Sequence, residues 1–183
     1  MFTHQDLLDC MLSVLNGHEA VLALAFRQRA KFEGWLKLEL AVNLAAHGAR
    51  SLVLEAPCGA GQRADLGFTM DGVPYLIELK TANTNWRLPG VAPKTRPITK
   101  NISGIVTDAR KLMRCQARGF VAFVLFPLPV ADYRWAHYLQ RVSSQTGIAL
   151  SEDGHCRRTN VRLPNGEGCE AVVCCFSVSG LAR

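Results

Sequence analysis

The chain has 183 residues, of which 49% are hydrophobic and 20% charged, and its formal net charge is +6 at pH 7. This composition excludes a disordered chain, and the length favours a single domain over residues 1–183 that needs no stapling to hold a core. No apolar run approaches the roughly 18 residues of a membrane span, and the acidic N-terminus lacks the basic start of a signal peptide. We therefore expect a cytoplasmic protein with no membrane partner, and the positive charge favours a polyanionic partner such as nucleic acid.

The N-terminal part, about residues 1–48, reads as three helices. Thr3 is the expected cap of the first, which carries apolar residues at helical spacing and ends near Asn16. The second helix is expected over about residues 18–30 and the third over about residues 34–46, closed by a glycine.

Two strands joined by Asp71 and Gly72 follow a short strand at residues 51–57. An Asp-Gly pair flanked by alternating apolar residues is a strong signal for a two-residue hairpin, here between residues 63–70 and 73–80. Counted outward from this turn, Asp65 faces Glu78 at a non-hydrogen-bonded position, with the side chains roughly 5 Å apart. Lys80 shares their face. The opposite face collects eight apolar side chains fit for a core, namely Ala64, Leu66, Phe68, Met70, Val73, Tyr75, Ile77 and Leu79.

The two opposed carboxylates call for a cation. At about 5 Å and an effective dielectric of about 20 their repulsion is on the order of 3 kcal/mol. Hard divalent ions such as Mg²⁺ take carboxylate oxygens plus waters, and a neighbouring ammonium can orient the attacking water or remove its proton. The alternative is an ordinary charged strand face, with Arg63 pairing with Asp65 or Glu78, because a Glu-x-Lys tripeptide is common by chance.

A basic, Pro-rich segment at residues 82–101 follows Lys80 almost directly and contains no acid. It is expected to form a mobile arm that holds phosphates while its tryptophan stacks on a base. The alternative is a solvated loop with the tryptophan folded onto the core. Its candidate nucleic-acid-binding residues are Trp86, Arg87, Lys94, Arg96 and Lys100.

The rest of the chain alternates helices and strands. An amphipathic helix is expected at residues 98–115, an almost wholly apolar central strand at 119–128, a further helix at about 132–144 and a last strand at 169–178. A helix between the hairpin and the apolar strand predicts an α/β fold with a mixed β-sheet flanked by helices.

Seven cysteines occur in the chain. Four lie in apolar patterns where thiols act as small core residues: Cys10, Cys115, Cys174 and Cys175. A zinc site is the minor alternative, and it would combine His155, Cys156 and Cys169 with Cys174 or Cys175. It has no Cys-x₂-Cys pair, and adjacent cysteines on a strand point to opposite faces.

Acidic helix, strand, Asp-bearing strand, Glu-x-Lys strand, helix and apolar strand follow one another over about residues 33–128. In this order the chain resembles the PD-(D/E)XK nuclease superfamily, with its restriction-endonuclease-like fold. The resemblance implies that Asp65 and Glu78 bind Mg²⁺, for which Mn²⁺ can substitute, and that Lys80 assists the attacking water.

The same resemblance implies an acid from the helix before the sheet. Glu39, one turn from Asn43 in an apolar helix, is the expected auxiliary metal ligand, with Glu55 as its substitute; a snorkelling surface role for Glu39 is the alternative. Asp108 and Lys111 resemble an Asp-x-x-Lys-Leu sequence sometimes seen on the following helix of such proteins, which would bring Lys111 toward the site.

Mg²⁺-dependent phosphodiester hydrolysis of DNA, endonuclease-like, is the leading hypothesis, and a homodimer would let two sites cut two strands. The alternative is a catalytically inactive nucleic-acid-binding or assembly protein on the same fold. The choice between DNA and RNA, the specificity and the pathway are not readable from these residues.

Overall fold

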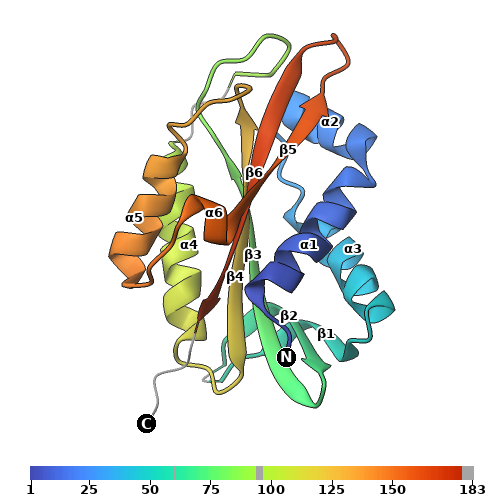
Figure 1. The fold of residues 1–183 in the computed structure, drawn as a ribbon, viewed down its shortest axis with the longest axis vertical. Coiled ribbons are helices and arrows are strands. Elements are labelled where there is room, and N and C mark those ends of the chain that lie inside the picture. The colour runs from blue at the N-terminus through green and yellow to red at the C-terminus, as the bar shows by residue number, and fades with distance from the viewer. Residues whose placement is uncertain (60, 94–96, 179–183) are drawn as a thin grey trace.

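A six-stranded mixed sheet with helices on both faces forms the protein, as the computed structural model shows (Figure 1). The structure describes residues 1–59, 61–93 and 97–178, so that Lys94 and Arg96 lie outside the described residues. The strands lie in the order β1-β2-β3-β4-β6-β5. Only the β3–β4 pair is parallel; the other neighbours are antiparallel. The expected α/β class with a mixed sheet is confirmed. The strands are β1 (Arg50–Pro57), β2 (Arg63–Met70), β3 (Val73–Asn83), β4 (Arg118–Leu128), β5 (Cys156–Arg162) and β6 (Gly168–Val178).

The helices divide between the two faces of the sheet. The N-terminal three cover one face and α4 and α5 cover the other (Figure 1). Thr3 caps the first helix as expected, in a reciprocal capping box with Asp6. The helices are α1 (His4–Asn16), α2 (Glu19–Gln28), α3 (Glu33–Ala46), α4 (Ile98–Leu112), α5 (Ala136–Thr146) and the short α6 (Glu152–His155).

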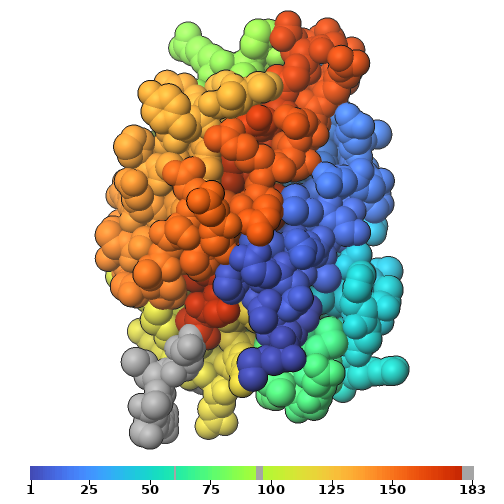
Figure 2. Space-filling model, viewed as in Figure 1, coloured from blue at the N-terminus to red at the C-terminus, as the bar shows by residue number. Residues whose placement is uncertain are grey.

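The strand β5 was not expected from the sequence. Three arginines and an asparagine interrupt its pattern, and its residues alternate between exposed and buried only from Arg158 onward. It is an edge strand of the sheet. It pairs with β6 from Cys156↔Cys174 to Arg162↔Gly168. The N-terminal helix α1 lies against this C-terminal region, where blue meets orange in Figure 2. His4 stacks on His155 there, with the ring centroids 4.9 Å apart.

Two hydrophobic cores lie on the two sides of the sheet. Of the eight apolar residues expected on one face of the hairpin, seven lie in or against the core beneath α1, α2 and α3. Ala64 is the exception and packs with Ala56 in the core beneath α4. The alternation fails there because the ladder between β2 and β3 ends at Leu66↔Ile77.

In the described part of the chain, no single helix is long and apolar enough to cross a membrane. The helices α1 and α2 satisfy length and composition only when taken together, across a bend of 86°.

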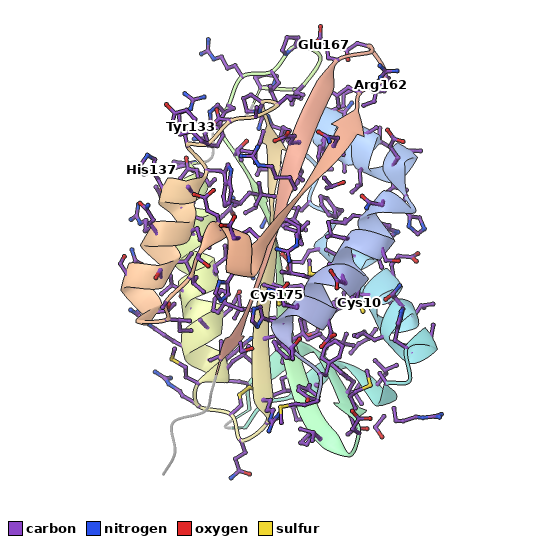
Figure 3. All side chains as sticks on the ribbon, in the orientation of Figure 1. Cys10, Tyr133, His137, Arg162, Glu167 and Cys175 are labelled. Atoms are coloured by element: carbon purple, nitrogen blue, oxygen red, sulfur yellow. A yellow bond between two sulfur atoms is a disulfide. The ribbon has the colours of Figure 1, made fainter. Side chains whose placement is uncertain are left out.

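Phe26 joins α2 to the sheet, and its loss should destabilise the fold. Its ring stacks on Phe126 at 4.8 Å and is only 1% exposed. We expect Phe26→Ala to lower the free energy of unfolding by about 3–5 kcal/mol, measured by urea denaturation. Tyr133→Ala is the matched control, because Tyr133 is 76% exposed on the outer side of the molecule (Figure 3) and its removal should cost less than about 0.5 kcal/mol. Equal losses in the two variants would contradict this assignment of the core.

Candidate active site

The strands β2 and β3 diverge at the candidate site. They pair in the expected register from Met70↔Val73 to Leu66↔Ile77. Beyond that point the main-chain N–H of Leu79 donates to Asp65 Oδ2 at 2.8 Å, while β3 continues beside β4. The register is the expected one, but the ladder ends one pair before Asp65 and Glu78, so these two residues do not form a ladder pair. The Asp65 side chain accepts the Leu79 N–H in place of a main-chain carbonyl of β2. The Asp65 carboxylate contacts Lys37 of α3, and the Glu78 carboxylate contacts Lys111 of α4.

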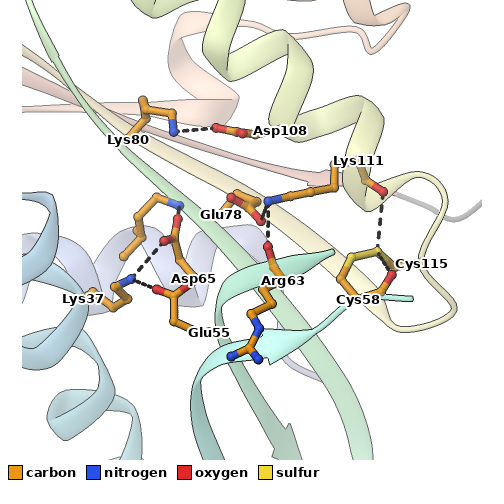
Figure 4. A network of polar contacts seen from close by, with 11 residues as sticks. Lys37, Glu55, Cys58, Arg63, Asp65, Glu78, Lys80, Asp108, Lys111 and Cys115 are labelled. Carbon is orange, nitrogen blue, oxygen red and sulfur yellow. Dashed lines mark hydrogen bonds and ion pairs between the residues drawn. A yellow bond between two sulfur atoms is a disulfide. The ribbon is translucent and has the colours of Figure 1, made fainter. Parts of the chain in front are cut away.

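Glu78 and Lys80 share the face of β3 that lies against α4, as their spacing of two predicts. Lys80 Nζ lies 2.9 Å from Asp108 Oδ2, and Lys111 Nζ pairs with Glu78 Oε1 (Figure 4). Lys111 also donates to the main-chain carbonyl of Arg63 at 2.8 Å. Lys111 thus reaches the site as expected. Two ion pairs link β3 to α4: the strand supplies the lysine of one pair and the glutamate of the other.

On the other side, α3 supplies two residues that the sequence did not single out. Lys37 Nζ lies 3.1 Å from Asp65 Oδ1 and also pairs with Glu55. Glu33, one turn before Lys37, accepts a hydrogen bond from the main-chain N–H of Thr81 at 3.1 Å. The i, i+4 spacing of Glu33 and Lys37 was the available signal, because such residues share one side of a helix.

Glu39 lies on the other side of the same helix. The buried stripe of α3 includes Leu36. At about 100° per residue, Lys37 lies about 100° from Leu36 in one direction and Glu39 about 60° from it in the other. Glu39 accordingly pairs with His18 at 3.8 Å, with its side chain 36% exposed. Glu55, its proposed substitute, is the acid brought next to Asp65, through their shared contact with Lys37.

Burial dominates the electrostatics of the site. It raises the pKa of Glu78 to about 7, against the opposing effect of Lys111, with Asp108 and Asp65 adding to the rise. Burial by itself would lower the pKa of Lys80, but the hydrogen bond and the charge of Asp108 outweigh it, and the net pKa is raised. Lys80 is therefore an ammonium at neutral pH, suited to orient a water or stabilise negative charge rather than to remove a proton.

Arg63 does not neutralise the acids. Its guanidinium points away from both Asp65 and Glu78 (Figure 4), and its main chain rather than its side chain contacts the site. The three lysines supply the positive charge instead.

The fit of the site to Mg²⁺ follows from its donors. Asp65 and Glu78 offer only carboxylate oxygens, and buried Glu78 Oε1 meets Lys111 as an ion pair while accepting no well-formed hydrogen bond. Within residues 1–59, 61–93 and 97–178, no three His, Cys, Asp or Glu side chains gather as a ready cation site. Mg²⁺ is commonly held by one or two carboxylates and keeps several waters, so this pair fits it once the lysines give way.

Part of the basic segment is hydrogen-bonded to the N-terminal helical region. Buried Arg29 donates to the main-chain carbonyls of Thr84 and Ala92, at 2.6 and 2.7 Å, and to that of Trp86. The Trp86 ring packs edge-on against Tyr138 at 5.9 Å, and the guanidinium of Arg134 lies 5.3 Å from its centroid. The structure thus places Trp86 on the core, which was the alternative expectation.

The two other described basic residues of this segment, Arg87 and Lys100, are exposed.

The cysteines do not form the zinc site considered as an alternative. Cys156 and Cys174 face each other in the core beneath α4, whereas Cys169 and Cys175 lie in the core on the opposite side of the sheet. The sheet keeps these two pairs apart, so one ion cannot bind both. Cys175 belongs to the sheet itself and is labelled in Figure 3.

Three of the four expected core thiols, Cys10, Cys174 and Cys175, are free and buried. Cys115 is buried in the core as expected, but it is not a free thiol. It forms a disulfide with Cys58, with the Cα atoms 5.5 Å apart, and so joins the loop after β1 to the end of α4.

No protein-family model matches the chain, and comparisons with curated proteins and with solved structures found no match. The class of the protein thus comes from its fold and site alone. It is an α/β protein whose six-stranded mixed sheet carries a buried cluster of acids and lysines.

The raised pKa of Glu78 should make the metal-free protein less stable as the pH rises. The folded state holds this proton up to a pH of about 7, whereas the ordinary value is 4.5. Between these values the folded state binds more protons than the unfolded state, so the free energy of unfolding falls with rising pH and stays lower above it.

Glu78→Gln should remove a fall on the order of 2 kcal/mol between about pH 5 and pH 8. Urea denaturation in a chelator across this range measures it. Any cost of the substitution that does not depend on pH leaves this slope unaffected. Equal slopes in the variant and the original protein would contradict the burial of a Glu78 charge.

Proposed function

We propose that the protein hydrolyses phosphodiester bonds in DNA with Mg²⁺, as an endonuclease-like enzyme. The observation that carries the proposal is the meeting of Asp65, Glu78 and Lys80 at the point where β2 and β3 diverge, with Lys111 entering from α4. Buried titratable groups with strongly shifted pKa values cluster at catalytic sites, and Glu78 is such a group.

The order of elements supports this proposal. The sequence α3-β1-β2-β3-α4-β4, with β1, β2 and β3 antiparallel and β4 parallel to β3, follows the order on which the resemblance to PD-(D/E)XK nucleases rests. A restriction-endonuclease-like fold is part of the proposal.

The roles of the residues follow from their positions. Mg²⁺ bound by Asp65 and Glu78 would supply charge neutralisation at the phosphate and a more acidic water. Lys80, held as an ammonium by Asp108, donates a hydrogen bond to the attacking water. Lys111 is placed to stabilise the negative charge that develops on the phosphoryl oxygens.

The proposed DNA contacts are electrostatic. Arg87 and Lys100 are exposed on either side of the stretch that contains Lys94 and Arg96, and the chain as a whole has a net charge of +6. Trp86 is assigned no base stacking, because Arg134 and Tyr138 occupy its ring. A homodimer and a cytoplasmic location stay predictions from the sequence.

A second candidate, a non-catalytic nucleic-acid-binding or assembly protein, is favoured by one observation. Asp65, Glu78 and Lys80 are all already in ion pairs, with Lys37, Lys111 and Asp108 respectively. Acids and lysines that neutralise one another can have a purely structural role, in which they hold α3 and α4 on the sheet.

The proposal predicts that Asp65→Ala reduces DNA cleavage by at least about a hundredfold, since it removes a metal ligand. The assay measures cleavage of linear, branched and single-stranded DNA with Mg²⁺ or Mn²⁺. Glu39→Gln is the matched control, and it should leave the rate unchanged because Glu39 pairs with His18 on the other side of α3.

The proposal would be overturned if the original protein cleaved none of these substrates. It would also be overturned if the original protein cleaved one of them and Asp65→Ala left the rate unchanged. The second candidate would then stand if DNA binding fell with rising salt and disappeared when Arg87, Lys94 and Arg96 were replaced, while replacements of Asp65, Glu78 and Lys80 left it intact.

A further inference from the structure

We propose that Lys37 is a built-in counter-ion of Asp65, which competes with the divalent cation for that carboxylate and so sets the cation affinity of the site. The inference rests on the proposed function, because it needs Asp65 to be a metal ligand. Lys37 thereby becomes a positioning residue of the site.

The two oxygens of Asp65 are used differently. Oδ2 accepts the main-chain N–H of Leu79 at 2.8 Å, a bond that holds the carboxylate at the opening between the strands. Oδ1 lies 3.1 Å from Lys37 Nζ. Oδ1 is therefore the oxygen that the backbone leaves free for a cation, and the ammonium of Lys37 lies there.

The Lys37–Asp65 contact is shielded enough to influence the affinity. Each of the two side chains is 16% exposed, so the solvent screens their attraction less than that of a surface ion pair. The charges also repel directly, because a divalent cation at Oδ1 would lie within a few ångströms of an ammonium.

Glu55 gives the displaced ammonium another partner. It already forms an ion pair with Lys37, and its side chain is 51% exposed at the edge strand β1. The flexible four-carbon stem of lysine lets its ammonium leave Asp65 and keep Glu55. Lys37 can therefore yield to a cation without leaving its own charge unpaired.

A purely structural role for Lys37 makes the opposite prediction. If Lys37 only ties α3 to β1 and β2, its removal loosens the carboxylate and weakens cation binding or leaves it unchanged.

The experiment measures Mn²⁺ binding to the full chain by isothermal titration calorimetry at fixed pH and without DNA. Lys37→Met, which keeps the length and removes the charge, should bind Mn²⁺ roughly tenfold more tightly than the original protein. Lys37→Arg, which restores the charge, should return the affinity toward the original value. Lys31→Met is the matched control, since Lys31 is exposed just before α3, and it should not change the affinity.

If Lys37→Met does not fold, Lys37→Gln replaces it, because the amide can still donate to Asp65 without a charge. The same tightening is expected.

Unchanged or weaker Mn²⁺ binding in the folded variant that lacks the charge would overturn the inference. The proposed function is tested separately by Asp65→Asn in the original background. If Asp65→Asn weakens Mn²⁺ binding while the loss of the Lys37 charge does not tighten it, the metal site stands and the competition fails. If the original protein binds no Mn²⁺, or binds it equally well with Asp65→Asn, the metal site and the inference fail together.

Discussion

Compensation of buried charge at the opening between β2 and β3 is the constraint on which the rest of the site depends. Glu78 is nearly inaccessible and Asp65 largely so, and the charge of a buried carboxylate needs a compensating partner. Lysines from α3 and α4 supply that charge in the structure. Removal of one partner of such a pair would leave an uncompensated charge, at a cost of about 3–5 kcal/mol for a fully buried pair. The placement of α3 is thus tied to Asp65 and that of α4 to Glu78.

The sheet topology creates this opening. The long strand β3 pairs with β2 along one edge only as far as Ile77 and with β4 along the other edge as far as Asn83. Glu78 and Lys80 therefore lie beyond the point where the ladder with β2 ends. The Leu79–Asp65 hydrogen bond and the two ion pairs between β3 and α4 lie at this opening. Under the proposed function, a phosphate and its cation would bind at the same opening.

Much of the fold and part of the site could be predicted from the sequence. The Asp71-Gly72 turn fixed the hairpin register correctly as far as Leu66, because a two-residue turn leaves little freedom. The count could not show that the ladder ends before Asp65, because counting along a hairpin assumes that the ladder continues. Glu39 was chosen from the sequence because it is an acid in an apolar helix, but it pairs with His18 instead. Lys37 reaches the site because of its position around α3, and which side of the helix faces the site depends on tertiary packing. The strand β5 was missed because an arginine-rich edge strand lacks an apolar pattern.

The central claim is that these carboxylates form a cation site now balanced by lysines. Crystals soaked in Mn²⁺, with anomalous difference maps, test it most directly. The account predicts a peak in contact with both Asp65 and Glu78, with the Lys37 ammonium moved from Asp65 toward Glu55 and that of Lys111 moved from Glu78. Maps without a peak there at saturating Mn²⁺, and with both ion pairs retained, would contradict it and leave the cluster as a structural clamp.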